Sequence, residues 1–202
     1  MTTPILFNSL LILFQFLFMP NKLFLISGTS GVGKTTIAYE LLKQMPNLER
    51  LVTYVTREPR PEEINGQDYH FVSREEFEKK IQSNEMFEYD EHYGNYYGNS
   101  RLDLEKIWEQ GKIVIIVLDV NGVRTVKKVF PEAKSIFILP DNLENLKDRI
   151  RQRPMNDEAF AKRWERVEKE LKLANEYDFR VINEQGKIDQ AVAKTRAIIE
   201  NN

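Results

Sequence analysis

The sequence predicts an α/β fold in which helices cover both faces of a parallel β-sheet. Continuous apolar runs, typical of strands buried on both faces, recur along the chain. Segments with helical spacing of apolar residues separate these runs, and such alternation favours a parallel sheet. With 202 residues, 42% of them apolar and 30% charged, the chain has the composition of one globular domain.

The predicted elements begin with the apolar run KLFLIS at residues 22–27, which is expected to form a buried strand. A helix is expected at 36–45, because Ile37, Leu41 and Leu42 fall on one helical face. The later strands are expected at 112–119 (KIVIIVLD), 135–139 (SIFIL) and 179–183 (FRVIN). The later helices are predicted from apolar residues at helical spacing, namely Val123, Val126 and Phe130, then Leu143, Leu146 and Ile150, then Phe160, Trp164, Val167, Leu171 and Ala174, and last Ile188, Ala191, Val192, Thr195, Ile198 and Ile199.

Two segments interrupt this alternation. Residues 54–105 are rich in Tyr, Glu, Gly and Asn and contain short alternating pieces, which indicates a small insertion beside the core. Residues 151–163 (RQRPMNDEAFAKR) are dense in arginine. Pro154 is expected to end the preceding helix at or before Arg153, because the residue before a proline is disfavoured in helical geometry.

The first residues of the chain are unusually apolar. Residues 1–21 carry no charge, yet no basic residue precedes the run 5–19, as a signal peptide would require. The run is also shorter than the roughly 20 apolar residues of a membrane span. We expect Met19 to be the native start, so that 1–18 are an extension and 19–202 the domain. The alternatives are that residues 1–18 are a genuine extension or a membrane anchor, and the protein would contact a membrane only if residues 1–18 are part of it.

Composition excludes several classes of function. The chain has no cysteines, which rules out disulfides, thiolate nucleophiles and Cys-based metal sites and favours a cytoplasmic location. A net charge of −2 gives no reason to expect nucleic acid as a partner. His70 and His92 are the two histidines, and we interpret both as structural or exposed.

A phosphate-binding loop is the strongest motif. Residues 28–36 read GTSGVGKTT, which satisfies G-x-x-x-x-G-K-[ST] between an expected strand and an expected helix. Its glycines let successive backbone N–H groups point at phosphate oxygens, and the helix presents its positive end to the same anion. Lys34 is expected to reach the β- and γ-phosphates, and the Thr35 hydroxyl to bind Mg²⁺. The alternative is a glycine-rich turn without a ligand.

Asp119 follows the strong strand at its carboxyl end, beside this loop. An acid there suits a second Mg²⁺ contact, through water. The alternative is that Asp119 caps the turn DVNG.

A second anion site is indicated further along the chain. Arg57 and Arg60 lie in a proline-stiffened stretch, TREPRPEEINGQDYHFV, at 56–72. Arginine suits bidentate phosphate binding. Residues 87–99 (FEYDEHYGNYYGN) add tyrosines whose hydroxyls can complete a phosphate clamp. Each stretch alone is more typical of a solvated loop, but their occurrence beside a phosphate loop favours a binding role.

The motifs GTSGVGKT, TREPR, NGQDYHFV, YGNYYGN and DVNGV occur in this order and at spacing that resembles the guanylate kinase family, which moves a phosphoryl group from ATP to GMP. The resemblance covers about residue 22 to the C-terminus. It implies a P-loop kinase core with helices on both faces, a small α+β GMP-binding insertion at about 54–105 and an arginine-rich lid at about 149–166. It also implies ATP as co-substrate, GMP as acceptor and Mg²⁺, and it leaves monomer or homodimer open.

The resemblance also implies individual roles. The residues implied for ATP are Gly28, Thr29, Ser30, Gly31, Val32, Gly33, Lys34, Thr35, Thr36 and, near the adenine, Asn183. Those implied for GMP are Arg57, Arg60, Tyr69 and Tyr97 on the phosphate and Thr53, Glu88 and Asn99 at the base. Lys34, Arg149, Arg153 and Arg163 are implied to be catalytic, and Thr35 and Asp119 to hold the metal.

The chemistry of Glu88 agrees with base recognition. Guanine offers N–H donors at N1 and N2, and one carboxylate accepts both. Adenine has no donor at N1 and would leave a buried carboxylate poorly paired, which is costly. The acceptor phosphate needs no general base, because its second pKa is near 6 and its oxygen is already charged at neutral pH.

The sequence departs from the family pattern at four positions. Asn99 replaces a usual Ser or Thr, Val117 a further acid, Val55 a Thr and Glu62 a Gly. Asn99 still offers a donor and an acceptor. Two alternatives stay open: a P-loop kinase with another nucleotide or a phosphorylated sugar as acceptor, and a non-catalytic guanylate-kinase-like binding module. The intact Lys34 and Arg57 argue against the latter.

Overall fold

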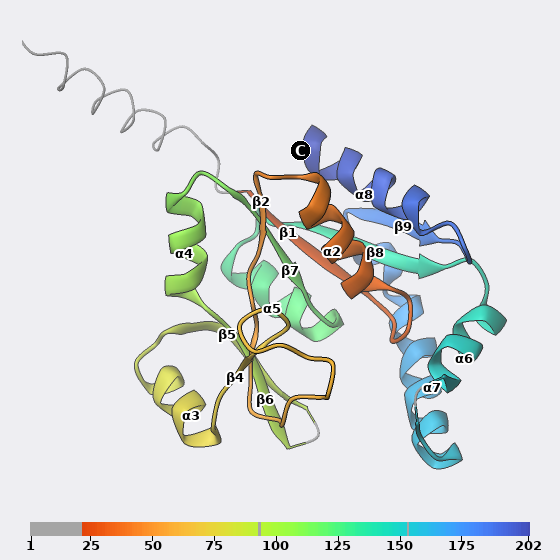
Figure 1. Ribbon diagram of the computed structural model, residues 1–202, viewed down its shortest axis with the longest axis horizontal. Helices are drawn as coiled ribbons and strands as arrows, with labels where there is room; N and C mark the ends of the chain where they lie inside the picture. Colours follow the sequence, from red (N-terminus) through yellow and green to blue (C-terminus); the bar gives the residue numbers. More distant parts are fainter. Residues whose placement is uncertain (1–21, 93, 153) are drawn as a thin grey trace, which may run out of the picture.

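The computed structural model describes residues 22–92, 94–152 and 154–202. Its central sheet has five parallel strands in the order β2-β7-β1-β8-β9 (Figure 1). The strands are β1 (Leu23–Gly28), β2 (Leu48–Arg50), β7 (Ile113–Val117), β8 (Lys134–Pro140) and β9 (Phe179–Asn183). This arrangement confirms the predicted α/β class.

Helices cover both faces of this sheet. They are α2 (Lys34–Gln44), α4 (Arg101–Glu109), α5 (Val120–Val129), α6 (Leu143–Arg151), α7 (Asp157–Lys172) and α8 (Ile188–Asn201), with the 3₁₀ turn η1 (Ala174–Glu176). The alternation along β1 divides the core, because successive strand residues point to opposite faces. Phe24 and Ile26 pack in the cluster that includes α2 and α8, whereas Leu23 and Leu25 pack with α4 and α5.

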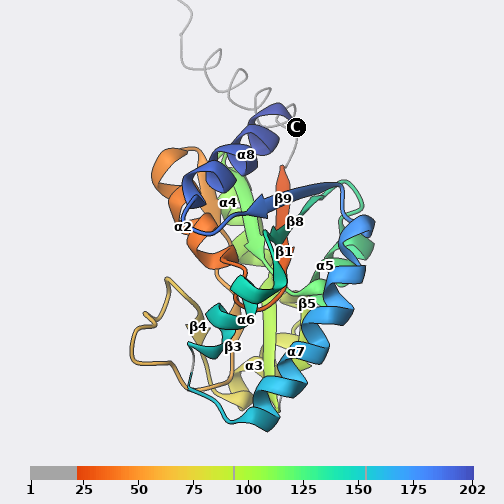
Figure 2. The same cartoon turned by 90° about the vertical axis from the view of Figure 1, so that its right-hand side faces the viewer.

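A second sheet, in the order β4-β3-β6-β5, lies within the stretch expected as an insertion. Its strands are β3 (Tyr54–Val55), β4 (His70–Phe71), β5 (Met86–His92) and β6 (Asn95–Ser100), and α3 (Arg74–Gln82) packs beside them. Helix α3 starts in a capping box formed by Ser73 and Glu76. The insertion and the pair α6 and α7 project from the same end of the core (Figures 1 and 2).

Two element ends are informative. Helix α6 ends at Arg151 with Gln152 as its C-cap, as expected from Pro154. Strand β7 ends at Val117, two residues earlier than predicted. The difference arises because Asp119 is already the N-cap of α5, so the chain has left the strand.

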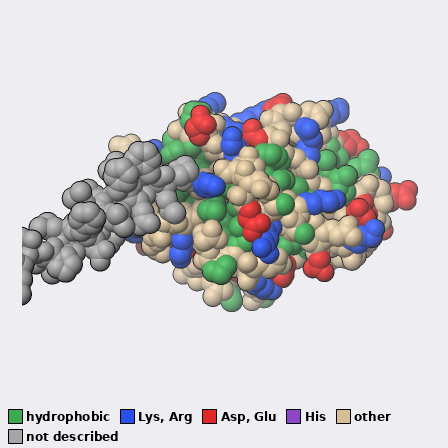
Figure 3. All heavy atoms as spheres, turned by 90° about the horizontal axis from the view of Figure 1, so that it is seen from above, with side chains coloured by type: hydrophobic (Ala, Val, Ile, Leu, Met, Phe, Trp, Pro, Cys, Tyr) green, Lys and Arg blue, Asp and Glu red, His purple; other side chains and the backbone are tan. Residues whose placement is uncertain are grey.

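The surface carries charges of both signs. On the face seen in Figure 3, basic and acidic side chains are interspersed among apolar and polar ones. Within residues 22–92, 94–152 and 154–202, no helix has both the length and the apolar character needed to cross a membrane. The apolar run at 5–19 lies outside the described residues.

Candidate active site

The loop between β1 and α2 curls because three glycines adopt backbone angles that other residues rarely reach. Gly28, Gly31 and Gly33 have φ angles of 142°, 78° and 98°. A Cβ on Gly28 would collide with the backbone oxygen of Ile138 on the neighbouring strand, so only glycine fits at this position. Gly33 is the N-cap of α2, and Lys34 begins the helix. The Lys34 ammonium donates to the carbonyls of Gly28 and Thr29 at 2.7 and 2.9 Å.

This loop opens onto a cleft of about 520 Å³. The predicted residues that line it from the donor side are Gly28, Ser30, Gly31, Lys34 and Thr35. From the acceptor side it is lined by Thr53, Arg57, Arg60, Tyr69, Glu88 and Tyr97, and Asp119 and Arg163 also face it. The structure therefore brings the two sets of residues predicted to bind anions, which are far apart in sequence, to one cavity.

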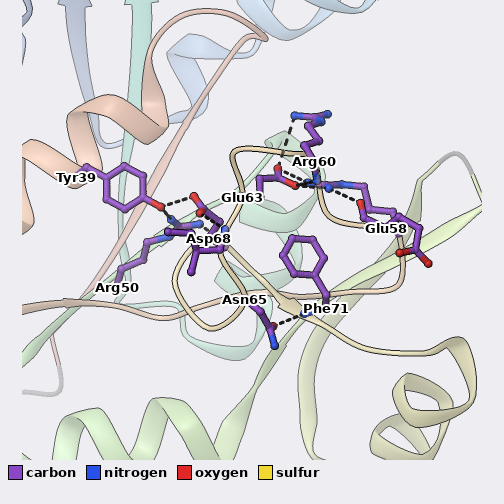
Figure 4. A network of polar contacts seen from close by, with 10 residues as sticks. Tyr39, Arg50, Glu58, Arg60, Glu63, Asn65, Asp68 and Phe71 are labelled. Atoms are coloured by element: carbon purple, nitrogen blue, oxygen red, sulfur yellow. Dashed lines mark hydrogen bonds and ion pairs between the residues drawn. The ribbon is translucent and has the colours of Figure 1, made fainter.

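Arg57 and Glu63 form the shorter of two ion pairs that Glu63 makes within residues 56–69. The Arg57 guanidinium donates two parallel hydrogen bonds to the Glu63 carboxylate, at 2.5 and 2.6 Å. Glu63 also accepts the Arg60 backbone N–H at 2.9 Å (Figure 4). The guanidinium lies 5.0 Å from the centre of the Tyr69 ring. Hydrogen bonds to Glu63 raise the pKa of Arg57, and they lower that of Glu63 against the opposing effect of burial.

Glu88 is a buried carboxylate that lines the cleft and is 5% exposed. One of its oxygens, Oε2, accepts from the Asn99 amide at 2.8 Å, and Asn99 in turn accepts from the Thr53 hydroxyl at 3.1 Å. Asn99 is fully buried and does not line the cleft itself. Burial raises the pKa of Glu88 to about 7, the Asn99 hydrogen bond opposes the rise, and the charge of Asp119 adds to it.

This raised pKa predicts a stability effect. A carboxyl whose pKa is about 7 when folded, above its usual 4.5, stabilises the fold below pH 4.5 and loses that contribution as the pH rises through 7. At pH 8 the ionised form costs on the order of 3 kcal/mol. Glu88→Gln stays neutral and can still accept from Asn99. We expect it to be more stable than wild type at pH 8 by up to this amount.

Urea unfolding at pH 8 and at pH 5 measures this effect, because the gain should fall to about a quarter of its pH 8 value at the lower pH. The exposed carboxyl Glu158 provides the control substitution Glu158→Gln, which should change little at either pH. A Glu88→Gln protein equal to wild type at pH 8 would show that the carboxyl is not destabilising when ionised.

The Asp119 carboxylate accepts a hydrogen bond that caps α5 and another from an arginine that the sequence did not indicate. Oδ1 accepts the Gly122 N–H at 2.8 Å, which is the capping alternative considered for this residue. Oδ2 accepts from Arg166 at 2.7 Å, and Arg166 also pairs with Glu170 at 2.7 Å. Arg166 lines the cleft, although no motif indicated it. Its position three residues after Arg163 on α7, one helical turn away, is the signal that could have found it.

Other predicted residues lie outside the cleft lining. Arg149 donates to the Gln185 side chain at 2.8 and 2.5 Å. The Asn183 amide donates to the Val32 carbonyl at 2.8 Å, beneath the phosphate loop. Arg153 falls outside the described residues. Thr29, Val32, Gly33 and Thr36 belong to the loop or helix but do not line the cavity.

The cleft offers few side chains that could hold a metal. Among the described residues, no group of three His, Cys, Asp or Glu side chains could hold an ion by itself. Thr35 is exposed and lines the cleft one residue after Lys34. Mg²⁺ usually keeps several waters and takes one or two protein oxygens plus substrate phosphates. The Thr35 hydroxyl and the Asp119 carboxylate both line the cleft and are oxygens of this kind, and Oδ2 of Asp119 is paired with Arg166 in this structure.

Comparison with known sequences gives one consistent family. A family model described as guanylate kinase matches residues 20–202. A guanylate kinase of Nitrosospira multiformis is 41% identical over 182 residues, which are 90% of this chain and 86% of that protein. A guanylate kinase of a Nostoc species is 42% identical over 167 residues, which are 82% of this chain and 84% of that protein.

Comparison with solved structures agrees. The crystal structure of guanylate kinase from Anaplasma phagocytophilum superposes with a TM-score of 0.73 at 28% identity, covering 89% of this chain and 85% of that one. A sugar kinase from a Janibacter species, at 14% identity and a TM-score of 0.50, covers 90% of this chain and 95% of its own and shares the fold alone.

Proposed function

The chain belongs to the guanylate kinase family, and from this premise we propose how its cleft transfers the γ-phosphoryl group of ATP to GMP, giving ADP and GDP. The observation that carries the proposal is that a backbone phosphate cradle and an arginine–tyrosine cluster line the same cavity. Two polyanions must approach one another for this reaction, and a cleft lined by separate anion sites supports that approach.

The donor half would be built from backbone and one lysine. The amides of residues 28–35 are proposed to hold the phosphates of ATP, and the positive end of α2 adds to their attraction. Lys34, now bonded to loop carbonyls, is proposed to turn to the β- and γ-phosphate oxygens. Mg²⁺, when bound, would screen the charge between these phosphates, and Thr35 and Asp119 are the side chains proposed to hold it.

The acceptor phosphate is proposed to be held by Arg57, Arg60, Tyr69 and Tyr97. The fork between Arg57 and Glu63 keeps the guanidinium ordered at the cleft wall, and the phosphate is proposed to accept from N–H donors that this fork does not use. The ring of Tyr69 lies 6.3 Å from that of Tyr97, so the two phenols border the same part of the pocket.

The base is proposed to bind at Glu88. Oε2 is held by Asn99, which leaves Oε1 as the oxygen free of this hydrogen bond, at the cleft wall beside Gly122. Thr53 lines the cleft beside them. Asn99 stands where a Ser or Thr is usual, and its side-chain amide orients the Glu88 carboxylate that is proposed to bind the base. Asn99 is proposed to act at the base through Glu88.

Catalysis needs no proton acceptor, because the GMP phosphate is largely ionised at neutral pH. Lys34 and Arg163 are proposed to neutralise the charge that develops on the transferring group. Arg149 and Arg153 stay predictions as lid residues, as does Asn183 near the adenine. A cytoplasmic location, expected from the cysteine-free sequence, and the oligomeric state also stay predictions.

A coupled assay of ADP release with GMP, dGMP, IMP, AMP and UMP tests the proposal. We expect GMP to give the highest kcat/KM and AMP to be at least about 10³-fold poorer, because adenine leaves the Glu88 carboxylate unpaired. Glu88→Gln should reduce the preference of GMP over AMP. If GMP gives no turnover while another acceptor does, the proposed acceptor is wrong, and if no acceptor turns over, a binding module is favoured.

A further inference from the structure

The loop that carries the acceptor-binding side chains, residues 56–69, is joined to the core through Asp68 (Figure 4). The Asp68 carboxylate accepts a hydrogen bond from the Tyr39 hydroxyl and another from the Ile64 backbone N–H, the latter at 2.8 Å. Its backbone oxygen accepts from the Arg50 guanidinium at 2.9 Å. One residue of the loop is thus bonded to the backbone of its own loop and to two side chains of the core.

Tyr39 and Arg50 both belong to the core, and Tyr39 lies on the helix that follows the phosphate loop. Tyr39 lies on α2, the helix that begins at Lys34, and Arg50 is the last residue of the parallel strand β2. The two side chains also contact each other, since Arg50 donates to the Tyr39 hydroxyl at 3.3 Å and lies over its ring at 5.6 Å. Arg50 is only 8% exposed, so water screens the contact weakly.

Asp68 is adjacent in the chain to a residue of the acceptor pocket. The next residue is Tyr69, whose ring lies 5.0 Å from the Arg57 guanidinium and 6.3 Å from the Tyr97 ring. Arg50 and Asp68 themselves line the cleft. A displacement of Asp68 would therefore move the phosphate-binding tyrosine relative to the loop that holds the donor phosphates.

We propose that Tyr39 and Arg50 are positioning residues that fix the acceptor loop relative to the phosphate loop and so set the affinity for the acceptor phosphate. The inference rests on the proposed function, because the two phosphates that must meet are bound on the two parts that this contact joins. Both residues act through Asp68. Their role is geometric, because they hold Asp68, and with it the neighbouring Tyr69, in the place where the acceptor phosphate is bound.

The test is Tyr39→Phe, which removes one hydroxyl and keeps the ring that packs beside Arg50. We expect the KM for GMP to rise about tenfold, the KM for ATP to change less than about twofold and kcat to fall less than about threefold. Tyr54→Phe is the matched control, because Tyr54 also donates its hydroxyl to an aspartate, Asp103 at 2.8 Å, and does not line the cleft.

A second variant, Arg50→Met, keeps the apolar stem and removes the donor to the Asp68 carbonyl. If both side chains act through Asp68, the double variant should raise the KM for GMP by less than the product of the single effects. Equal KM values for Tyr39→Phe and Tyr54→Phe would overturn the inference. A wild-type protein that does not phosphorylate GMP would instead overturn the proposed function.

Discussion

Replacing Lys34 with alanine is expected to lower kcat for ATP and GMP by about 10³-fold, with little change in the binding of GMP. The ammonium donates to two carbonyls of the glycine loop, and Lys34 lines the cleft in which the transferring phosphate is proposed to bind. Its loss removes charge neutralisation that matters most in the transition state, whereas the acceptor pocket keeps all its side chains. Single-turnover kinetics and GMP titration by calorimetry measure the two effects separately.

The matched control is Lys43→Ala on the same helix. Lys43 is exposed and pairs with Glu40 one turn away, so its removal changes net charge and helix composition without touching the cleft. We expect its kcat to stay within about twofold of wild type. Full activity in Lys34→Ala would contradict the assignment of the donor site.

Replacing Arg57 with alanine is expected to raise the KM for GMP by about 100-fold while leaving the KM for ATP nearly unchanged. The substitution removes a guanidinium from the acceptor pocket and leaves the partly buried Glu63 carboxylate without its main partner, and a 100-fold change corresponds to about 2.7 kcal/mol. Initial-rate kinetics with each substrate varied in turn gives the two KM values.

Two further variants separate phosphate binding from the repulsion that an unpaired Glu63 would cause. Arg57→Ala combined with Glu63→Gln removes the excess negative charge, and we expect it to regain only part of the affinity. Arg124→Ala is the control, because Arg124 also forms a paired contact with a glutamate, Glu176, away from the cleft. A double variant with wild-type KM for GMP would show that Arg57 serves the loop and not the phosphate.

Much of the fold could be predicted from the sequence because its signals are local. The apolar runs predicted the positions of β1, β7, β8 and β9, and Pro154 predicted the end of α6. The prediction was wrong at the end of β7, which was expected to reach Asp119. Asp119 is the N-cap of α5, and an N-cap has an extended backbone like that of a strand residue. Whether a residue continues a strand or caps the next helix depends on where that helix packs.

The candidate site divides in the same way. The motif residues of both anion sites could be named from the sequence, and the structure brings most of them to one cleft. Arg166 and Tyr39 were missed, because each lies at an ordinary helical position without a motif. Their importance comes from partners that only folding supplies: Asp119 is 47 residues from Arg166, and Asp68 is 29 residues from Tyr39.

The sequence by itself determined the phosphate loop, since its shape depends on glycines at fixed spacing and on the helix that follows directly. It also determined the kinds of side chain available to hold an acceptor. Only the tertiary structure decided which charges are paired, that Asn99 turns its amide to Glu88, and that Asp68 connects the acceptor loop to α2. Such contacts depend on the packing of several elements at once, and no spacing along the chain encodes their distances.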